Sequence, residues 1–193
     1  MGRTAKFTPE QFVDAALELV AAHGPVAVTM SAVAGRLSAP IGSVYHRFAS
    51  RDVLLARLWL QIVQSFQKGF LDNLRHEGGL EAALHTPRWV RAHPKEAKLL
   101  LLYRREELIS GPWPEEIQSL AASVARELDA GIRQFARQAL GSGAKSALRR
   151  TQFALIDVPH AAVRRSLIAD EALPQEVDRM VSETYTAILG RNS

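Results

Sequence analysis

The sequence predicts an all-α fold in two parts, a small helical domain at the N-terminus and a larger helical domain after it. Apolar residues recur at three- and four-residue spacing along most of the chain. No stretch alternates apolar and polar residues as a half-buried strand does, and proline or glycine separates the helical stretches at short intervals. We therefore expect two domains, residues 1–50 and residues 51–193.

Composition excludes several classes of protein. The chain has 193 residues, of which 47% are hydrophobic, so it is long enough to bury a sizeable core. It has no cysteine, which excludes disulfides, thiolate zinc sites and cysteine nucleophiles. No apolar run approaches the ~18 residues of a membrane span, and the basic N-terminus lacks the apolar segment of a signal peptide. We expect a cytoplasmic protein that does not contact a membrane.

The first helix is predicted from its capping residues. Thr8-Pro9-Glu10-Gln11 supplies a cap, a proline for the first helical position and a capping-box glutamine. An apolar stripe follows until Gly24-Pro25 ends the helix. The members of this stripe are Phe12, Ala16, Leu19 and Val20.

Two short helical patterns then meet across a tight turn. Thr29 caps a helix over Met30 to Leu37, and Ser38-Ala39 makes the turn. Pro40, with its fixed φ and missing N–H, suits the first position of a second helix that runs to about Phe48. This pattern predicts a helix-turn-helix, and the preceding helix completes the three-helix core that such a unit needs.

The second helix of the pair has an outward face suited to DNA. A helical wheel puts Val44 and Phe48 at the centre of its buried face, and Gly42, Ser43 and His46 point away. No Asp or Glu occurs between Leu19 and Arg51, as a helix lying between phosphates requires. A plain helical hairpin gives the same pattern, so the residues alone leave both interpretations open.

A long helix is expected directly after this unit. Ser50 is its cap, Asp52 lies in its first turn, and the helix runs from Val53 to about Arg75. Further helical patterns cover about 80–92 (broken or restarted at Pro87), 95–108, 114–140, 144–157 with a kink or restart at Pro159, and a last helix opened by Pro174. Any tilt of the long helix would move the helix-turn-helix.

The block LSAPIGSVYHRFASRDVLLARLW resembles the recognition helix and following helix of the TetR family of transcriptional regulators. The matching or chemically similar positions are Gly42, Ser43, Val44, Tyr45, Phe48, Ser50, Arg51, Asp52 and Leu55. Two positions depart from the family pattern, because Ser38 replaces the turn glycine and Ile41 replaces a common lysine. The resemblance covers roughly the first 60 residues and is only architectural beyond them.

The resemblance implies a surface that contacts double-stranded DNA. In the family, residues corresponding to Thr29, Ile41, Ser43, Tyr45 and His46 lie at the DNA, with the tyrosine usually on a phosphate. A basic N-terminal arm lies near the backbone or minor groove, although Arg3 and Lys6 fit a solvated terminus equally well. The expected DNA-contacting residues are Arg3, Lys6, Thr29, Pro40, Ile41, Gly42, Ser43, Tyr45, His46, Arg47 and Arg51.

A small-molecule effector is implied for the larger domain, where the family keeps a ligand cavity between helices. Most aromatic residues of this chain fall in the same region, and ordinary core packing explains them equally. Arg104 and Arg105, beside Tyr103, hint at an anionic group on the ligand, and on an exposed turn they would carry no such meaning. The expected ligand-contacting residues are Trp59, Phe66, Phe70, Trp89, Tyr103, Arg104, Trp113 and Phe135.

The family also implies a homodimer, built as a four-helix bundle from the last two helices of each subunit. A two-fold dimer is what a helix-turn-helix usually needs to reach two half-sites. Here the last two helices are amphipathic, which simple core packing would also explain. The expected interface residues are Phe153, Ile156, Val177, Val181, Tyr185 and Ile188.

No pattern in the sequence indicates catalysis. The six histidines form neither an HExxH motif nor an i, i+4 pair, and no GxSxG, P-loop or Gly-rich dinucleotide turn occurs. We therefore expect no metal, no cofactor and no enzymatic activity. The expected function is that of a ligand-responsive transcriptional repressor that binds a palindromic operator as a dimer. The alternative is a helical ligand-binding or interaction protein without specific DNA binding, for which the departures at Ser38 and Ile41 would be the signs.

Overall fold

The computed structural model describes residues 7–108 and 113–190, and this part of the chain is helical without a strand. None of its helices has the length and apolarity to cross a membrane. The predicted all-α class is confirmed. The elements are α1 (Pro9–His23), the 3-10 turn η1 (Pro25–Ala27), α2 (Met30–Arg36), α3 (Ile41–Tyr45), α4 (Arg51–His76), α5 (Gly79–Ala92), α6 (Pro94–Leu102), α7 (Arg105–Leu108), α8 (Glu115–Leu140), α9 (Lys145–Gln152), the π-helical turn η2 (Phe153–Asp157), α10 (Val158–Ala169) and α11 (Glu176–Leu189).

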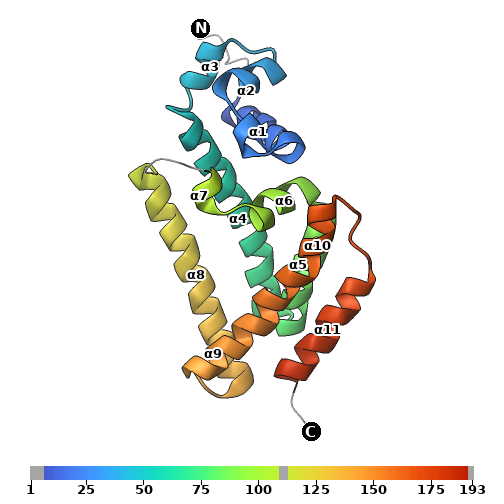
Figure 1. Cartoon of the computed structure of the whole chain (residues 1–193). Coiled ribbons are helices and arrows are strands. Elements are labelled where there is room, and N and C mark those ends of the chain that lie inside the picture. The colour runs from blue at the N-terminus through green and yellow to red at the C-terminus, as the bar shows by residue number, and fades with distance from the viewer. Residues whose placement is uncertain (1–6, 109–112, 191–193) are drawn as a thin grey trace.

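The segment from α1 to α3, which we call the head, lies at one end of the molecule (Figure 1). Helices α1 and α2 begin at the predicted caps. The backbone N–H of Thr8 donates to Gln11 Oε1 at 2.9 Å and the N–H of Gln11 donates to Thr8 Oγ1 at 3.4 Å, which completes the capping box. The side chain of Thr29 accepts from the N–H of Ala32 at 3.0 Å and so caps α2.

The turn between α2 and α3 explains one departure from the family pattern. Ser38 has φ = 51°, in the left-handed region that glycine adopts without steric penalty. The N–H groups of Ser38 and Ala39 donate to the carbonyls of Gly35 and Ala34, so the turn closes around this residue. The chain therefore keeps the turn of a helix-turn-helix with serine in the position where glycine is favoured.

Helix α3 is shorter than expected. It ends at Tyr45 instead of about Phe48, and Pro40 is its N-cap rather than its first helical residue. The N–H of Phe48 still donates to the carbonyl of Val44 at 2.9 Å, so the backbone continues to turn after the regular helix ends. Val44 and Phe48 are buried, as the helical wheel predicted.

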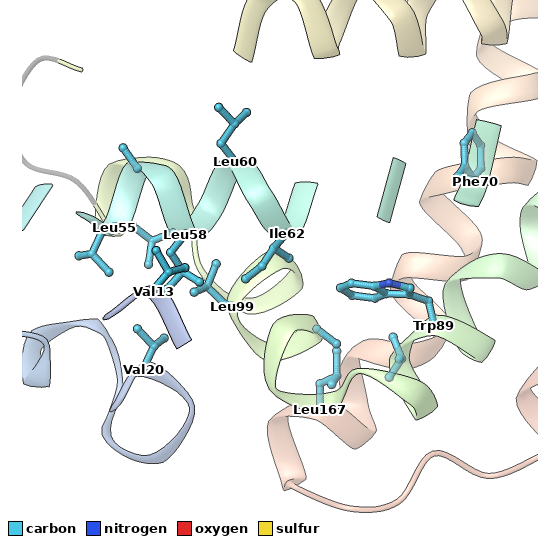
Figure 2. Close-up of a cluster of buried hydrophobic side chains, with 14 of the residues drawn as sticks. Val13, Val20, Leu55, Leu58, Leu60, Ile62, Phe70, Trp89, Leu99 and Leu167 are labelled. Carbon is cyan, nitrogen blue, oxygen red and sulfur yellow. The ribbon is translucent and has the colours of Figure 1, made fainter. Parts of the chain in front are cut away.

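Helix α4 connects the head to the larger domain (Figure 1). Ser50 caps it, accepting from the N–H of Val53 at 3.2 Å. Near the head, Leu55 and Leu58 of α4 share a buried cluster with Val13 of α1 and Leu99 of α6 (Figure 2). Helix α1 packs against both α4 and α6, so the head is seated on two helices of the larger domain.

The middle of the chain differs from the sequence prediction at two points. Pro87 neither breaks nor restarts α5, which is continuous around it. The expected helix over 95–108 is interrupted at Tyr103, which is extended, and so divides into α6 and α7. The N–H of Arg104 donates to Glu107 Oε2 at 2.8 Å, a local bond that starts the new turn.

The kink expected at Pro159 takes the form of a π-helical turn. Because proline has no N–H and its ring clashes with the preceding turn, a regular α-helix is disfavoured there. The N–H of Val158 donates instead to the carbonyl of Phe153, which widens the turn before α10 begins. Helix α11 begins at Glu176, two residues after Pro174, whose carbonyl accepts from the N–H of Val177.

The larger domain encloses the lower part of α4. Helices α5 and α8 pack against α4, and α10 and α11 pack against α5 (Figure 1). This arrangement places residues from α4, α5, α6, α8, η2 and α10 around one interior space.

Candidate functional site

The outward face of α3 is the first candidate site. Ile41, Gly42, Tyr45 and His46 are exposed, and Ser43 is partly exposed. Pro40 at the start of α3 and Thr29 at the start of α2 are exposed as well. The predicted orientation of the helix is therefore found in the structure, and contact with DNA remains a prediction for these residues. Arg3 and Lys6 lie outside the described residues.

Arg47 faces the protein rather than a ligand. Its Nη1 donates to the carbonyl of Ser43 at 2.9 Å and its Nη2 to the carbonyl of Phe7 at 2.5 Å. The guanidinium also lies 5.5 Å from the centroid of the Phe12 ring. These contacts tie the start of α1 to the end of α3, and contact of Arg47 with DNA stays a prediction.

Arg51 is likewise turned inward. Its Nε donates to the carbonyl of Val28 at 2.8 Å and its Nη2 to the carbonyl of Pro25 at 2.8 Å. Its Nη1 bonds Asp52 Oδ1 at 3.1 Å and the carbonyl of Leu108 at 3.4 Å. These bonds occupy the donors of Arg51 within the protein, and its expected phosphate contact stays a prediction. The side chain joins the first turn of α4 to η1 and to α7.

A second link joins the head to the larger domain. Glu18 of α1 forms ion pairs with Lys95 of α6 and with Arg36 of α2, the latter at 3.4 Å. The hydrogen bond from Lys95 is the main cause that lowers the pKa of the Glu18 carboxyl. The charged form of Glu18 is thus favoured, and the link persists at neutral pH.

The second candidate site is a cavity of about 460 Å³ in the larger domain. Of the expected aromatic residues, Trp59, Phe66 and Phe70 line it. Trp113 and Trp89 support this wall from behind, with ring centroids 5.3 Å from Trp59 and 5.1 Å from Phe66, respectively. Its volume lies in the range of pockets that hold small molecules.

The remaining expected ligand residues do not reach the cavity. Arg104 is exposed and Tyr103 is only partly buried, and neither belongs to the cavity wall. The ring of Phe135 lies close to Gly79 and to the Tyr185 hydroxyl, in the packing between helices. The expectation of an anionic group near Arg104 is therefore wrong for this cavity. Helical periodicity showed which residues are apolar but not which of them border an empty space.

Sequence reasoning missed four polar residues of the cavity wall, which are Gln67, Thr86, His160 and Arg164. The Gln67 amide donates to the carbonyl of Val124 at 2.6 Å, and Arg164 Nη1 donates to the carbonyl of Leu101 at 3.0 Å. The Thr86 hydroxyl is buried without a partner. A polar residue within an apolar helical stripe was the signal available for Gln67 and Thr86.

His160 is held in its neutral form by its surroundings. Burial lowers the pKa of this imidazole, and the nearby Asp157 carboxylate opposes the shift only in part. Burial also lowers the pKa of His85, whose Nε2 bonds the carbonyl of Phe66 at 2.9 Å. Two neutral histidines thus flank Phe66 at the cavity, with ring centroids 5.0 Å and 6.1 Å away.

The expected dimer stripe lies largely inside the subunit. Val177 and Val181 are buried, and α11 packs its apolar face on α5 of the same chain. Ile156 lines the cavity, and Tyr185 and Ile188 are partly buried. Val177 and Val181 are thus core residues of this subunit and Ile156 is a cavity residue, whereas an interface role for the partly exposed Tyr185 and Ile188 stays a prediction. Periodicity shows that a face is apolar but not what covers it.

Other apolar side chains are exposed on the same C-terminal segments. Phe153 is 49%, Ile168 63% and Met180 54% exposed. Of the expected interface residues, only Phe153 belongs to this exposed set. Among the described residues, no group of three or more metal-ligating side chains lies close enough to hold a metal ion.

The internal role of Arg51 predicts how its replacement behaves. Arg51→Lys keeps the charge but removes the planar group that reaches three backbone carbonyls, so we expect a loss of about 2 kcal/mol in the free energy of unfolding. Arg57→Lys on the same helix is the control, because Arg57 is exposed and has one ion pair with Glu116 at 3.4 Å. Its effect should stay below about 0.5 kcal/mol in urea unfolding. Equal effects of the two changes would contradict the role of Arg51.

Comparison with known proteins agrees with this architecture. Residues 12–58 match the family described as bacterial regulatory proteins, tetR family. No curated protein sequence matches the chain. A tetR-family regulatory protein from Rhodococcus RHA1 shares 16% identity and a TM-score of 0.73, covering 98% of this chain and 100% of that one.

Two further similar structures are of proteins named FadR. The fatty acid degradation regulator FadR from Bacillus halodurans has 16% identity and a TM-score of 0.70, with 98% of each chain covered. FadR from Bacillus subtilis, solved in complex with stearoyl-CoA, has 13% identity and a TM-score of 0.69, covering 96% of this chain and 100% of that chain. At these identities the likeness establishes the fold. The chain therefore has the fold of TetR-family transcription regulators, and its residues 12–58 carry the N-terminal domain of that family.

Proposed function

We propose that this protein is a dimeric transcriptional repressor. Its α3 helices would bind an inverted-repeat operator, and a small molecule would release the protein from the DNA. The observation that carries the proposal is the exposed face of α3, which has no carboxylate and lies one short turn before α4. Residues 1–50 would bind DNA, and residues 51–193 would bind the effector and the second subunit. The protein would act in the cytoplasm, as a regulator rather than an enzyme.

The exposed residues of the head suit two kinds of DNA contact. Thr29 and Tyr45 offer hydroxyl donors to phosphates, which position a protein without reading sequence. Ser43 and His46 offer hydrogen bonds to base edges, and Ile41 offers an apolar contact to a thymine methyl. Within the described residues, operator recognition would depend on Thr29, Ile41, Ser43, Tyr45 and His46.

A second candidate function rests on the two inward arginines. Arg47 and Arg51 donate hydrogen bonds to backbone carbonyls of the head. The head therefore has fewer cations available for phosphates than the sequence suggested. A helical ligand-binding protein without specific DNA binding would show the same arrangement. DNA-binding measurements separate the two functions.

The cavity supports a small-molecule effector with a large apolar part. Its wall is mostly aliphatic and aromatic, and α4 contributes Trp59, Phe66 and Phe70 to it. The FadR structure with stearoyl-CoA is a precedent for a ligand of this kind in the same fold. Because α4 also carries the head, a ligand that favours one tilt of α4 would change the spacing of the two α3 helices in a dimer.

The dimer proposal rests on the exposed apolar side chains of the C-terminal segments. Phe153, Ile168 and Met180 lie on η2, α10 and α11, respectively. Apolar side chains that are exposed together mark interaction sites, and we infer that these three contribute to one. Two copies joined there would present α3 twice about a two-fold axis.

We expect substitutions at the two kinds of DNA contact to change DNA affinity in different ways. Tyr45→Phe should weaken binding to operator and unrelated DNA by a similar factor, about 1 kcal/mol, because it removes a backbone contact. Ser43→Ala and His46→Ala should each cost roughly 1 to 3 kcal/mol on the preferred sequence alone. Fluorescence anisotropy with DNA from upstream of the chain's own gene measures these affinities.

The matched control for Ser43→Ala is Ser119→Ala, at an exposed position of α8 far along the chain. It should leave both affinities unchanged. If wild-type protein binds all DNA equally, or if the Ser43 and His46 variants keep the sequence preference, α3 is not the reading helix.

The dimer is tested by charging its proposed surface. Phe153→Glu with Met180→Glu should give a folded monomer, because two carboxylates would be buried against apolar surface in the dimer. Leu120→Glu, at an exposed apolar position of α8, is the control and should stay dimeric. Analytical ultracentrifugation at micromolar concentration distinguishes these states. A monomeric wild type, or a double variant that stays dimeric, would refute this interface.

A further inference from the structure

Among the described residues, two threonine hydroxyls are buried without a hydrogen-bond partner. Thr86 is 1% exposed and Thr151 is 0% exposed. A buried hydroxyl that bonds nothing destabilises a folded chain, so each such group calls for an explanation. In a helix, threonine often bonds the carbonyl one turn earlier, and neither residue does so. The two differ in one respect, because Thr86 borders the cavity and Thr151 does not.

His160 is a second polar group of the wall with unused hydrogen-bonding capacity. Its imidazole makes no hydrogen bond to residues 7–108 or 113–190, and its ring centroid lies 6.1 Å from that of Phe66. Burial keeps it neutral by lowering its pKa, so it presents one donor nitrogen and one acceptor nitrogen. Gln67 differs, since its amide N–H already donates to Val124.

The charges around the cavity select against an ionic ligand. Among the described residues, no Asp, Glu or Lys lines it, and the one charged lining residue, Arg164, is exposed and donates to the Leu101 carbonyl. An ammonium group inside would have no counter-charge. A carboxylate inside would have the exposed Arg164 as its only counter-charge. Burying a charge without an opposite charge is strongly unfavourable.

We propose that the cavity binds an uncharged, mostly apolar molecule with one oxygen function, a carbonyl or a hydroxyl, that hydrogen-bonds to Thr86 and His160. This inference rests on the proposed function in taking the cavity as the effector site. At roughly 30 Å³ for each non-hydrogen atom, the cavity volume corresponds to about ten to fifteen such atoms. Medium-chain ketones and alcohols fit both the volume and the polarity.

The first experiment compares four ten-carbon probes on the free full-length protein. Methyl octyl ketone and decanol carry the neutral oxygen function, decanoate carries a negative charge and decylammonium a positive one. Isothermal titration calorimetry at pH 7.5, checked by tryptophan fluorescence, gives the affinities. Both neutral probes should bind at least about tenfold more tightly than either ion.

Variants of the two threonines then test the contact. Thr86→Val keeps the shape of the side chain and removes the hydroxyl, so it should weaken ketone binding about fivefold, as expected for one neutral hydrogen bond. Thr151→Val is the matched control, an identical change at an equally buried, unpartnered hydroxyl away from the cavity, and should leave the affinity unchanged. Chlorodecane, which lacks the oxygen, should bind both variants and wild type alike. Both variants lose an unpaired polar group and should melt no lower than wild type.

Three results would overturn the proposal. One is that decanoate binds most tightly and loses its affinity in Arg164→Gln, which would make the cavity an acid site. Another is that Thr86→Val binds the ketone as wild type does. The third is that none of the probes binds. Since no DNA is present, these results do not depend on operator binding, and a failure to bind DNA would refute the proposed function while leaving the ligand class intact.

Discussion

The structure depends on one constraint, which is that α4 must pack against the head and border the cavity at the same time. Leu55 and Leu58 bury its first turns against the head, and Phe66 and Phe70 face the cavity farther along the same helix. An α-helix transmits a tilt along its length because its backbone hydrogen bonds resist bending. Arg51 fixes the upper end of α4 to the carbonyls of η1 and α7. We therefore expect a change in the cavity to reach the head through α4.

The parts of the fold that the sequence predicted best are those stabilised by local bonds. The capping bonds of Thr8, Thr29 and Ser50 join residues three positions apart, so a short motif contains both partners. The continuity of α5 at Pro87 was harder to predict, because burial offsets the free-energy cost of a proline inside a helix. Pro87 is buried, and so are Trp89 and Val90 nearby. The split at Tyr103 follows from one side-chain bond within a helical pattern that otherwise looks continuous.

The sites were predictable only where one element forms them. The outward face of α3 follows from the spacing of a few residues, and the structure has that face exposed. The inward turn of Arg51 depends on carbonyls 23 and 26 positions earlier in the chain. The cavity brings Thr86 of α5 together with His160 of α10, and no local pattern relates the two. The apolar stripe of α11 likewise gave no sign that α5 of the same subunit packs against it, because the contact joins distant parts of the chain.

Coupling between the cavity and the head is the claim that connects these features, and a linkage measurement tests it most directly. Methyl octyl ketone is titrated calorimetrically into the free protein and into its complex with a DNA fragment that it binds. Two sites that share one tilting helix must affect each other reciprocally. If the ligand releases the protein from DNA, the ketone binds more weakly to the complex than to the free protein. Equal affinities for the two forms would contradict the coupling through α4.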